Sequence, residues 1–155
     1  QRWSGVAALV WSAPQLANDV LDAYHPRKES TSGYSIADHP QLLGGLGHEL
    51  FEAFRREVLA LDPVVSEEFL KFYVAYKAET NFVDVVPQAK RLRLSLNMRF
   101  PDINDPRGLC KDVSGIGRWG NGDVEVSFTT LEELPYVMGL VRQSFERQMG
   151  NGEES

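Results

Sequence analysis

Short apolar segments follow one another between residues 70 and 128. They cover residues 70–77, 81–86, 91–98 and 123–128. In the third segment, apolar Leu92, Leu94, Leu96 and Met98 alternate with polar positions, and the fourth alternates in the same way. A period of two is typical of strands with one buried face and one solvent-exposed face. We therefore predict a small antiparallel sheet as the centre of the domain.

One further strand is expected before residues 123–128. Asn121-Gly122 is a strong signal for a two-residue hairpin turn, because both central residues of that turn need positive φ. Residues 116–119 would then pair with residues 123–128. The sheet is predicted to have four to five strands.

Helical spacing flanks the sheet on both sides. Residues 46–62 carry apolar side chains three and four positions apart, which predicts an amphipathic packing helix. Residues 64–72 suit either a short helix capped by Ser66 or the approach to the first strand, and we favour the helix. Thr130 and Glu133 form a capping-box pattern, and a closing helix is expected to begin near Pro135.

The N-terminal part of the chain is expected to be a connector. Residues 2–12 and 14–25 show two helical patterns, and the polar residues 26–35 follow them. We predict a helical connector over residues 1–45 and an α+β domain over residues 46–150. The chain opens with Gln1, so we expect it to be a fragment of a longer polypeptide.

The charge of the chain is acidic overall but unevenly distributed. The net charge is -6, yet residues 90–118 contain seven basic and three acidic residues, a local balance of +4. Asp123 and Glu125 should point the same way as Arg91 and Arg93, so cross-strand pairing would neutralise part of this charge. The apolar runs are too short to span a membrane, and a single cysteine, Cys110, suits a cytoplasmic protein.

The glycine-dense loop before the last strand is the first candidate for chemistry. Residues 115–120 match the dinucleotide-binding fingerprint as letters, but a hairpin and not a helix follows them. Two interpretations remain open. The glycines supply tight turns, or Arg118 and Trp119 present a cation and a stacking surface to a ligand.

Three other features were weighed as sites. Lys77 and Asn81 lie at the first hairpin and form either a polar cluster or a solvated turn. Asp84 with Gln88 and Lys90 resembles the acidic and basic pair of metal-dependent nucleases, although the predicted turn leaves little chain between them. The three histidines lack metal-site spacing, and no cofactor or metal is expected.

The strings FYVAYKAETNFVDVVPQAKRLRLSLNM, DPRGLCKDVSGIGRWGNGDVEV and LPYVMGLVRQSFERQ carry a family resemblance. They resemble a bacterial domain of unknown function that occurs as small free-standing "predicted transport" proteins and at the C-terminus of GmrSD-type, modification-dependent restriction proteins. The similarity covers roughly residues 46–148, and residues 2–14 are similar to the end of the nuclease region that precedes this domain. The element pattern also resembles small α+β domains of the CyaY and YjbR type. The resemblance implies no catalytic residues.

These observations lead to one main hypothesis. We expect a non-catalytic accessory or recognition domain of a phage-defence restriction protein, which binds DNA, a protein partner or its own upstream domains. The predicted binding residues are Lys77, Asn81, Arg91, Arg93, Arg118 and Trp119. A metal-dependent nuclease and a module for homo-oligomerisation are the alternatives.

Overall fold

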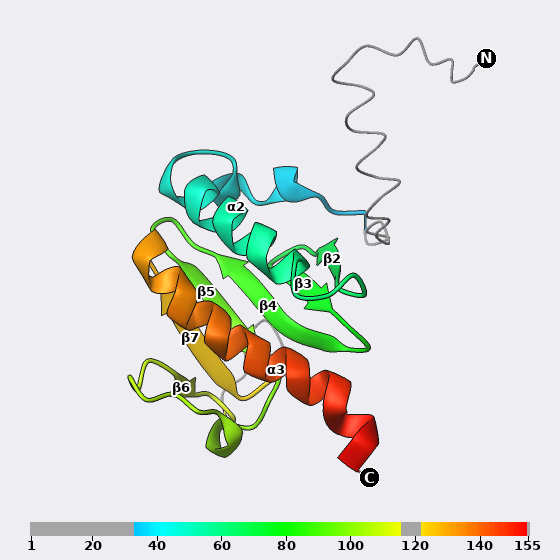
Figure 1. Ribbon diagram of the computed structural model, residues 1–155. Helices are drawn as coiled ribbons and strands as arrows, with labels where there is room; N and C mark the ends of the chain where they lie inside the picture. Colours follow the sequence, from blue (N-terminus) through cyan, green and yellow to red (C-terminus); the bar gives the residue numbers. More distant parts are fainter. Residues whose placement is uncertain (1–32, 116–121, 155) are drawn as a thin grey trace, which may run out of the picture.

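The structure is a computed structural model that describes residues 33–115 and 122–154, with side chains described as far as residue 150 (Figure 1). Its two α-helices are α2 (Gly45–Leu59) and α3 (Leu134–Glu154). The strands are β2 (Ser66–Phe69), β3 (Val74–Lys77), β4 (Asn81–Pro87), β5 (Leu92–Leu96), β6 (Lys111–Asp112) and β7 (Val124–Phe128). Short 3-10 helices are η1 (Ile36–Asp38), η2 (Pro40–Leu42), η3 (Phe100–Asp102) and η4 (Leu131–Glu133). The α+β class is confirmed, with six strands instead of the predicted four to five.

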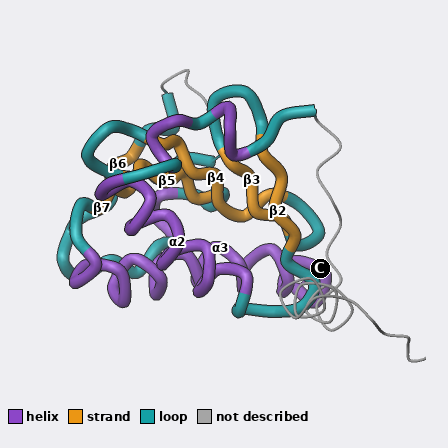
Figure 2. Tube along the Cα trace, turned by 90° about the horizontal axis from the view of Figure 1, so that it is seen from above, coloured by secondary structure: helices purple, strands orange, loops and turns teal. Residues whose placement is uncertain are grey.

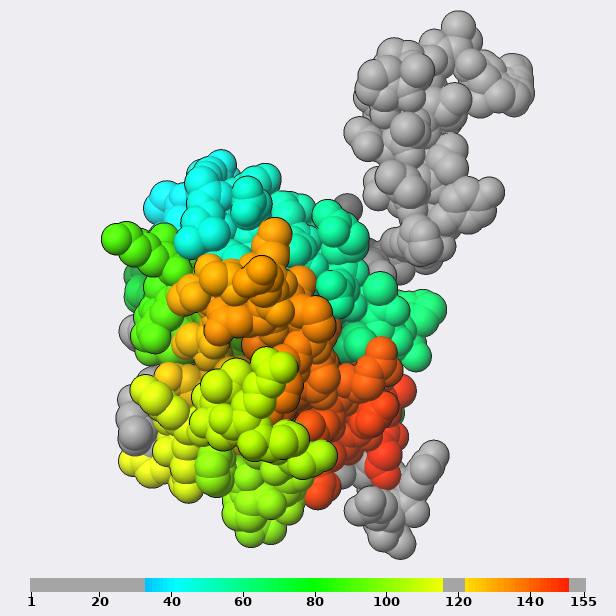
Figure 3. Space-filling view, turned by 60° about the vertical axis from the view of Figure 1, so that its left-hand side comes forward, coloured from blue at the N-terminus to red at the C-terminus, as the bar shows by residue number. Residues whose placement is uncertain are grey.

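The strands form one antiparallel sheet in the order β2-β3-β4-β5-β7-β6. Both α-helices lie in a layer on one side of this sheet (Figure 2). We call the helix-covered side the inner face and the opposite side the outer face. The long connection between β5 and β6 runs beside α3 (Figure 3), where Asn104 and Gln143 exchange two hydrogen bonds of 2.8 Å.

The hydrophobic core lies between the inner face and the helices. Partners in register across four strands are all apolar and buried: Val74, Val85, Leu94 and Val126. The helices contribute Leu50, Phe51, Phe54 and Val58 from α2 and Val137, Leu140, Val141 and Phe145 from α3. The predicted alternation in residues 92–98 and 123–128 is confirmed, because the apolar set faces this core.

The packing helix and the closing helix occur where their patterns predict them. Gly47 allows η2 to approach α2, because a Cβ at this position would lie 2.1 Å from the Gln41 carbonyl oxygen. The capping box of Thr130 and Glu133 is present and precedes η4. The α-helix then starts at Leu134, next to the proline that was expected to mark its beginning.

The prediction of a short helix in residues 64–72 is wrong, because this segment contains strand β2. A hydrogen bond of 2.8 Å from the Leu70 amide to the Tyr73 carbonyl closes a tight turn into β3. The extended backbone directs Glu67 inward, where its carboxylate accepts bonds from Arg55 and Tyr76, both at 2.8 Å. Four residues are too few for their own pattern to decide between helix and strand, so pairing with β3 decides it.

Two predictions concern residues outside the described ones. They are the N-terminal helix pair and the short strand at residues 116–119. The domain boundary between residues 45 and 46 also stays a prediction. Gly122 has the positive φ expected of the hairpin turn, 98°. A Cβ at Gly122 would also lie 2.0 Å from the Leu96 carbonyl oxygen, so a side chain does not fit. On the side of β7 away from β5, the described partner is strand β6, at residues 111–112.

Candidate binding surface on the outer face of the sheet

A row of mostly polar residues crosses the middle of the outer face. Strand register aligns one residue from each strand: Glu68, Ala75, Asp84, Ser95, Glu125 and Lys111. We call this set the outer row. It arises because every second residue of a strand points away from the core, and these residues are polar where their neighbours are apolar.

The centre of the outer row is buried. Asp84 is 1% exposed and Ser95 is 4% exposed. The Asp84 carboxylate accepts a hydrogen bond of 3.0 Å from Asn81 Nδ2. The Ser95 hydroxyl, by contrast, is a buried polar group with no hydrogen-bond partner among the described residues. Such a group is costly unless a partner satisfies it, so Ser95 is the most unusual position of this face.

Tyr73 lies at the edge of this centre. Its pKa is raised, first by burial and then by the carboxylates of Asp84 and Glu68. The phenol therefore stays protonated over a wider pH range and remains available as a hydrogen-bond donor.

The predicted binding residues are spread over the surface. Lys77 points to the outer face and its ammonium is 2.8 Å from the Glu68 carboxylate. Asn81 bonds Asp84, as described above, and its carbonyl accepts a bond of 2.8 Å from Asn97. The Lys77 and Arg93 backbones are roughly 16 Å apart, from four residues along the strands and two strands across. These residues do not form a single basic cluster.

The two arginines of the third segment differ in position. Arg91 is exposed in the turn before β5 and bonds Gln88. Arg93 belongs to β5, opposite Val86 and Ser127, and has no ion-pair partner among the described residues. Arg93 and Glu125 share the outer face, but Glu125 lies directly opposite Ser95 and not opposite an arginine. Arg118 and Trp119 lie outside the described residues.

Among the described residues, two candidates for chemistry were the Asp84 and Lys90 pair and Cys110. Asp84 is buried and Lys90 is exposed in the following turn, so they do not present a shared metal site to a substrate. Within residues 33–115 and 122–154, no group of three His, Cys, Asp or Glu residues could hold a metal ion. Burial and the Asp105 carboxylate raise the pKa of the Cys110 thiol to about 12, so it is not an activated nucleophile.

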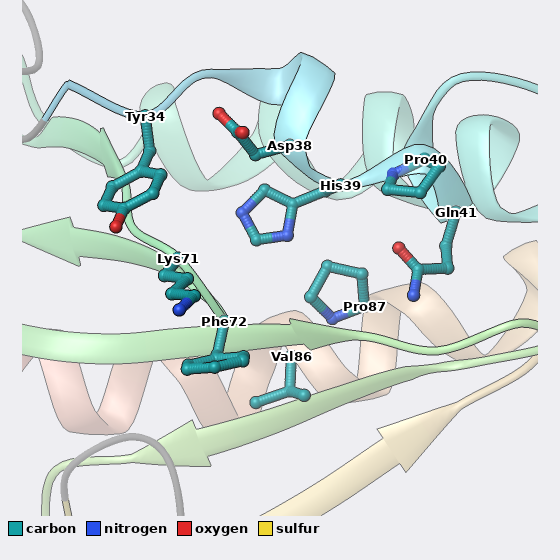
Figure 4. Close-up of a pocket in the computed structure, with 9 residues that line it drawn as sticks. All are labelled: Tyr34, Asp38, His39, Pro40, Gln41, Lys71, Phe72, Val86 and Pro87. Atoms are coloured by element: carbon teal, nitrogen blue, oxygen red, sulfur yellow. The ribbon is translucent and has the colours of Figure 1, made fainter.

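A hollow of about 450 Å³ adjoins one end of the outer face (Figure 4). It lies between η1 and η2, the β2–β3 turn and the end of β4. Its lining is Tyr34, Asp38, His39, Pro40, Gln41, Lys71, Phe72, Val86 and Pro87. Val86 also belongs to the outer face, opposite Arg93, so the hollow continues that surface.

Sequence reasoning missed the hollow. Its walls come from three segments far apart in sequence, and the domain boundary was expected at residue 45 although η1 and η2 form one wall. One signal was present. Phe72 stands at the centre of the turn between β2 and β3, and an aromatic side chain that is 43% exposed there has no role in the core.

Neither of the α-helices in the described residues has the length and apolar character that a membrane span requires.

Comparisons with known proteins place the described domain in a family. The family model "Domain of unknown function (DUF5655)" matches residues 47–148. A similar protein of Haemophilus influenzae, described as an uncharacterized protein, is 34% identical over 138 residues. This match covers 87% of the chain and 45% of the relative, so the chain spans about half the length of the curated relative. No solved structure gives a significant match.

Proposed function

We propose, from the premise that the chain belongs to the DUF5655 family, that it is a non-catalytic recognition domain that binds another polypeptide through its outer face. The observation that carries the proposal is the mixed charge of the outer face, where cations and carboxylates lie side by side across the strands. The first partner we propose is another part of the same, longer polypeptide, since the relative has more than twice the matched length.

The charges of the outer face favour protein over DNA. Three cations (Lys77, Arg93 and Lys111) lie among the carboxylates of Glu68 and Glu125 on this face, and the Asp84 carboxylate is buried beneath them. Binding to duplex DNA depends on cations that neutralise phosphates, and interspersed carboxylates oppose it. Mixed charges are instead typical of complementary protein interfaces.

Two measurements test the proposal. Hydrogen–deuterium exchange of the full-length H. influenzae relative should show slower exchange at the segment matched to β5 than the same segment shows in this chain. Fluorescence anisotropy at about 0.15 M salt should show no saturable binding of the chain to plain or modified duplexes. If both duplexes bind, and Arg91→Glu with Arg93→Glu abolishes that binding, the surface recognises DNA and the proposal is wrong.

Homo-oligomerisation is the weaker candidate. Strand β2 is at the edge of the sheet and could pair with a second copy. However, it is only four residues long, and a very short edge strand disfavours pairing between two sheet edges. Gel filtration combined with light scattering should therefore report a monomer.

The finer part of the proposal rests on the sequence resemblance. We propose that the domain serves a cytoplasmic, GmrSD-type restriction protein in phage defence. In a full-length protein of that type, Arg93→Glu at the corresponding position should lower protection in a phage plating assay. A control substitution at the position corresponding to exposed Arg142 of α3 should leave protection unchanged.

A further inference from the structure

The hollow beside the outer face contains a buried histidine, and only one of its two ring nitrogens has a hydrogen-bond partner among the described residues. His39 is 3% exposed, and its Nε2 lies 2.7 Å from the Leu70 carbonyl oxygen. A carbonyl oxygen only accepts hydrogen bonds, so Nε2 carries the proton and the other ring nitrogen, Nδ1, is an acceptor in the neutral imidazole. Although His39 is the N-cap residue of η2, its side chain makes no capping bond, and no described group bonds Nδ1.

The walls around His39 combine polar groups with two exposed aromatic rings. Figure 4 shows the imidazole in the middle of the hollow, between Tyr34 on one side and Gln41 on the other, with Pro87 below it. Phe72 and Val86 lie next to each other along the floor. The rings of Phe72 and Tyr34 are 43% and 38% exposed, so both offer surface for contact. The volume of about 450 Å³ falls within the usual range of ligand sites, and polar groups lie beside the two aromatic rings in the lining.

A cation completes the lining. Lys71 Nζ is 5.2 Å from the centroid of the Phe72 ring. A ring that stacked beside Phe72 would therefore also lie close to this ammonium, and indole is the aromatic side chain that attracts a cation most strongly.

We propose that the hollow binds the indole side chain of a tryptophan presented by the partner polypeptide. Indole has one N–H and no acceptor, which matches the acceptor-only His39 Nδ1. Its ring fits against Phe72 and Val86, and Lys71 adds a cation–π contact. Tryptophan is also among the side chains that most often dominate protein interfaces. This inference rests on the proposed function, because the partner is the protein bound by the outer face.

The test uses small probes of the side chain with the complete chain at a pH of about 8. N-acetyl-tryptophanamide should shift the NMR signals of the Val86 methyl groups and the His39 ring, with a Kd of roughly 1 mM. The benzothienyl analogue, in which sulfur replaces the N–H, should bind about tenfold more weakly, the effect of one hydrogen bond. Equal affinity for the two probes would overturn the role of His39.

Variants locate the site. His39→Gln keeps a donor at the ε position for Leu70 and removes the Nδ1 acceptor, so it should bind both probes equally weakly. Phe72→Ala, at an exposed position where folding is not at risk, should lose most of the affinity for both probes. Leu43→Ala, also exposed but outside the hollow, is the control and should bind as the wild type does. Unchanged binding by Phe72→Ala would reject the hollow as the site.

Two further outcomes show whether the bound tryptophan comes from a partner or from this chain, and whether this inference fails separately from the proposed function. Trp3, Trp11 and Trp119 of this chain lie outside the described residues. Probe binding that appears only after these three are changed to Phe would make an internal tryptophan the occupant and overturn the partner. If Arg93→Glu changes exchange at β5 in the full-length relative but the equivalent of Phe72→Ala does not, the proposed function stands and the tryptophan inference fails.

Discussion

Tyr76→Phe isolates one buried side-chain hydrogen bond between β3 and β2. Tyr76 is fully buried, and its hydroxyl donates to Glu67 Oε2 at 2.8 Å. The other carboxylate oxygen of Glu67 remains bonded to Arg55 at 2.8 Å. A phenylalanine keeps the edge-on contact with Phe54, whose ring centroid is 5.7 Å away, so packing is largely unchanged.

The expected loss of stability follows from the negative charge of the acceptor, the Glu67 carboxylate. A hydrogen bond to a charged group contributes about 1.5–3 kcal/mol, and the Glu67 side chain is only 11% exposed, so water replaces the hydroxyl poorly. We expect Tyr76→Phe to lower the free energy of unfolding by about 2 kcal/mol in urea denaturation followed by circular dichroism near neutral pH.

The same variant has a signature at high pH. Burial, and then the Glu67 carboxylate, raise the pKa of Tyr76 well above its ordinary value. The unfolded tyrosine ionises near pH 10 while the folded one stays protonated, so the unfolded state binds fewer protons. The stabilisation is complete below about pH 10 and falls by about 1.4 kcal/mol per pH unit above it. Tyr76→Phe should lack this part of the decline.

Tyr73→Phe is the matched control. The pKa of Tyr73 is also raised, but Tyr73 is on the outer face and only partly buried, so its removal should change the high-pH decline less. A Tyr76→Phe variant within about 0.5 kcal/mol of the wild type, with the same decline above pH 10, would refute the reasoning.

Three further predictions test other parts of the fold. Gly122→Ala should lower the free energy of unfolding by at least about 1–3 kcal/mol in urea denaturation, because φ is positive and the new Cβ would meet the Leu96 carbonyl. Gly108 also has a positive φ but lies in open space, so Gly108→Ala should lower the free energy of unfolding by less. Ser95→Ala should leave stability unchanged or raise it by up to about 1 kcal/mol in thermal denaturation, because it removes a buried hydroxyl without a described hydrogen-bond partner. A loss of more than about 1 kcal/mol would show that the Ser95 hydroxyl does make a hydrogen bond. Hydrogen bonds from the Thr129 and Thr130 amides lower the pKa of the Glu133 carboxyl. The ionised carboxylate therefore stabilises the fold above about pH 4.3, this stabilisation is lost as the pH falls, and Glu133→Gln should lack it. Identical acid unfolding of the variant and the wild type would contradict this.

Local pattern was sufficient where an element is long or its signal is specific. The two-residue alternation across residues 92–96 and 124–128, and the three- and four-residue spacing of α2, predict the elements the structure contains. The capping box of Thr130 and Glu133 predicts the start of the last helical segment. These signals depend on neighbours within one or two turns, so they can be recognised without knowledge of the fold.

Only the tertiary structure decided the candidate binding surface. The outer row needs the register of six strands, and the hollow joins η1 and η2 to a turn and a strand end that lie more than 25 residues further along the chain. Lys77 and Arg93 were both predicted as binding residues, and the strand order shows that they lie apart on the outer face. His39 carried no clear local signal. Local spacing determines which face of an element is apolar, but contacts between distant segments determine which polar groups are brought together and left without partners.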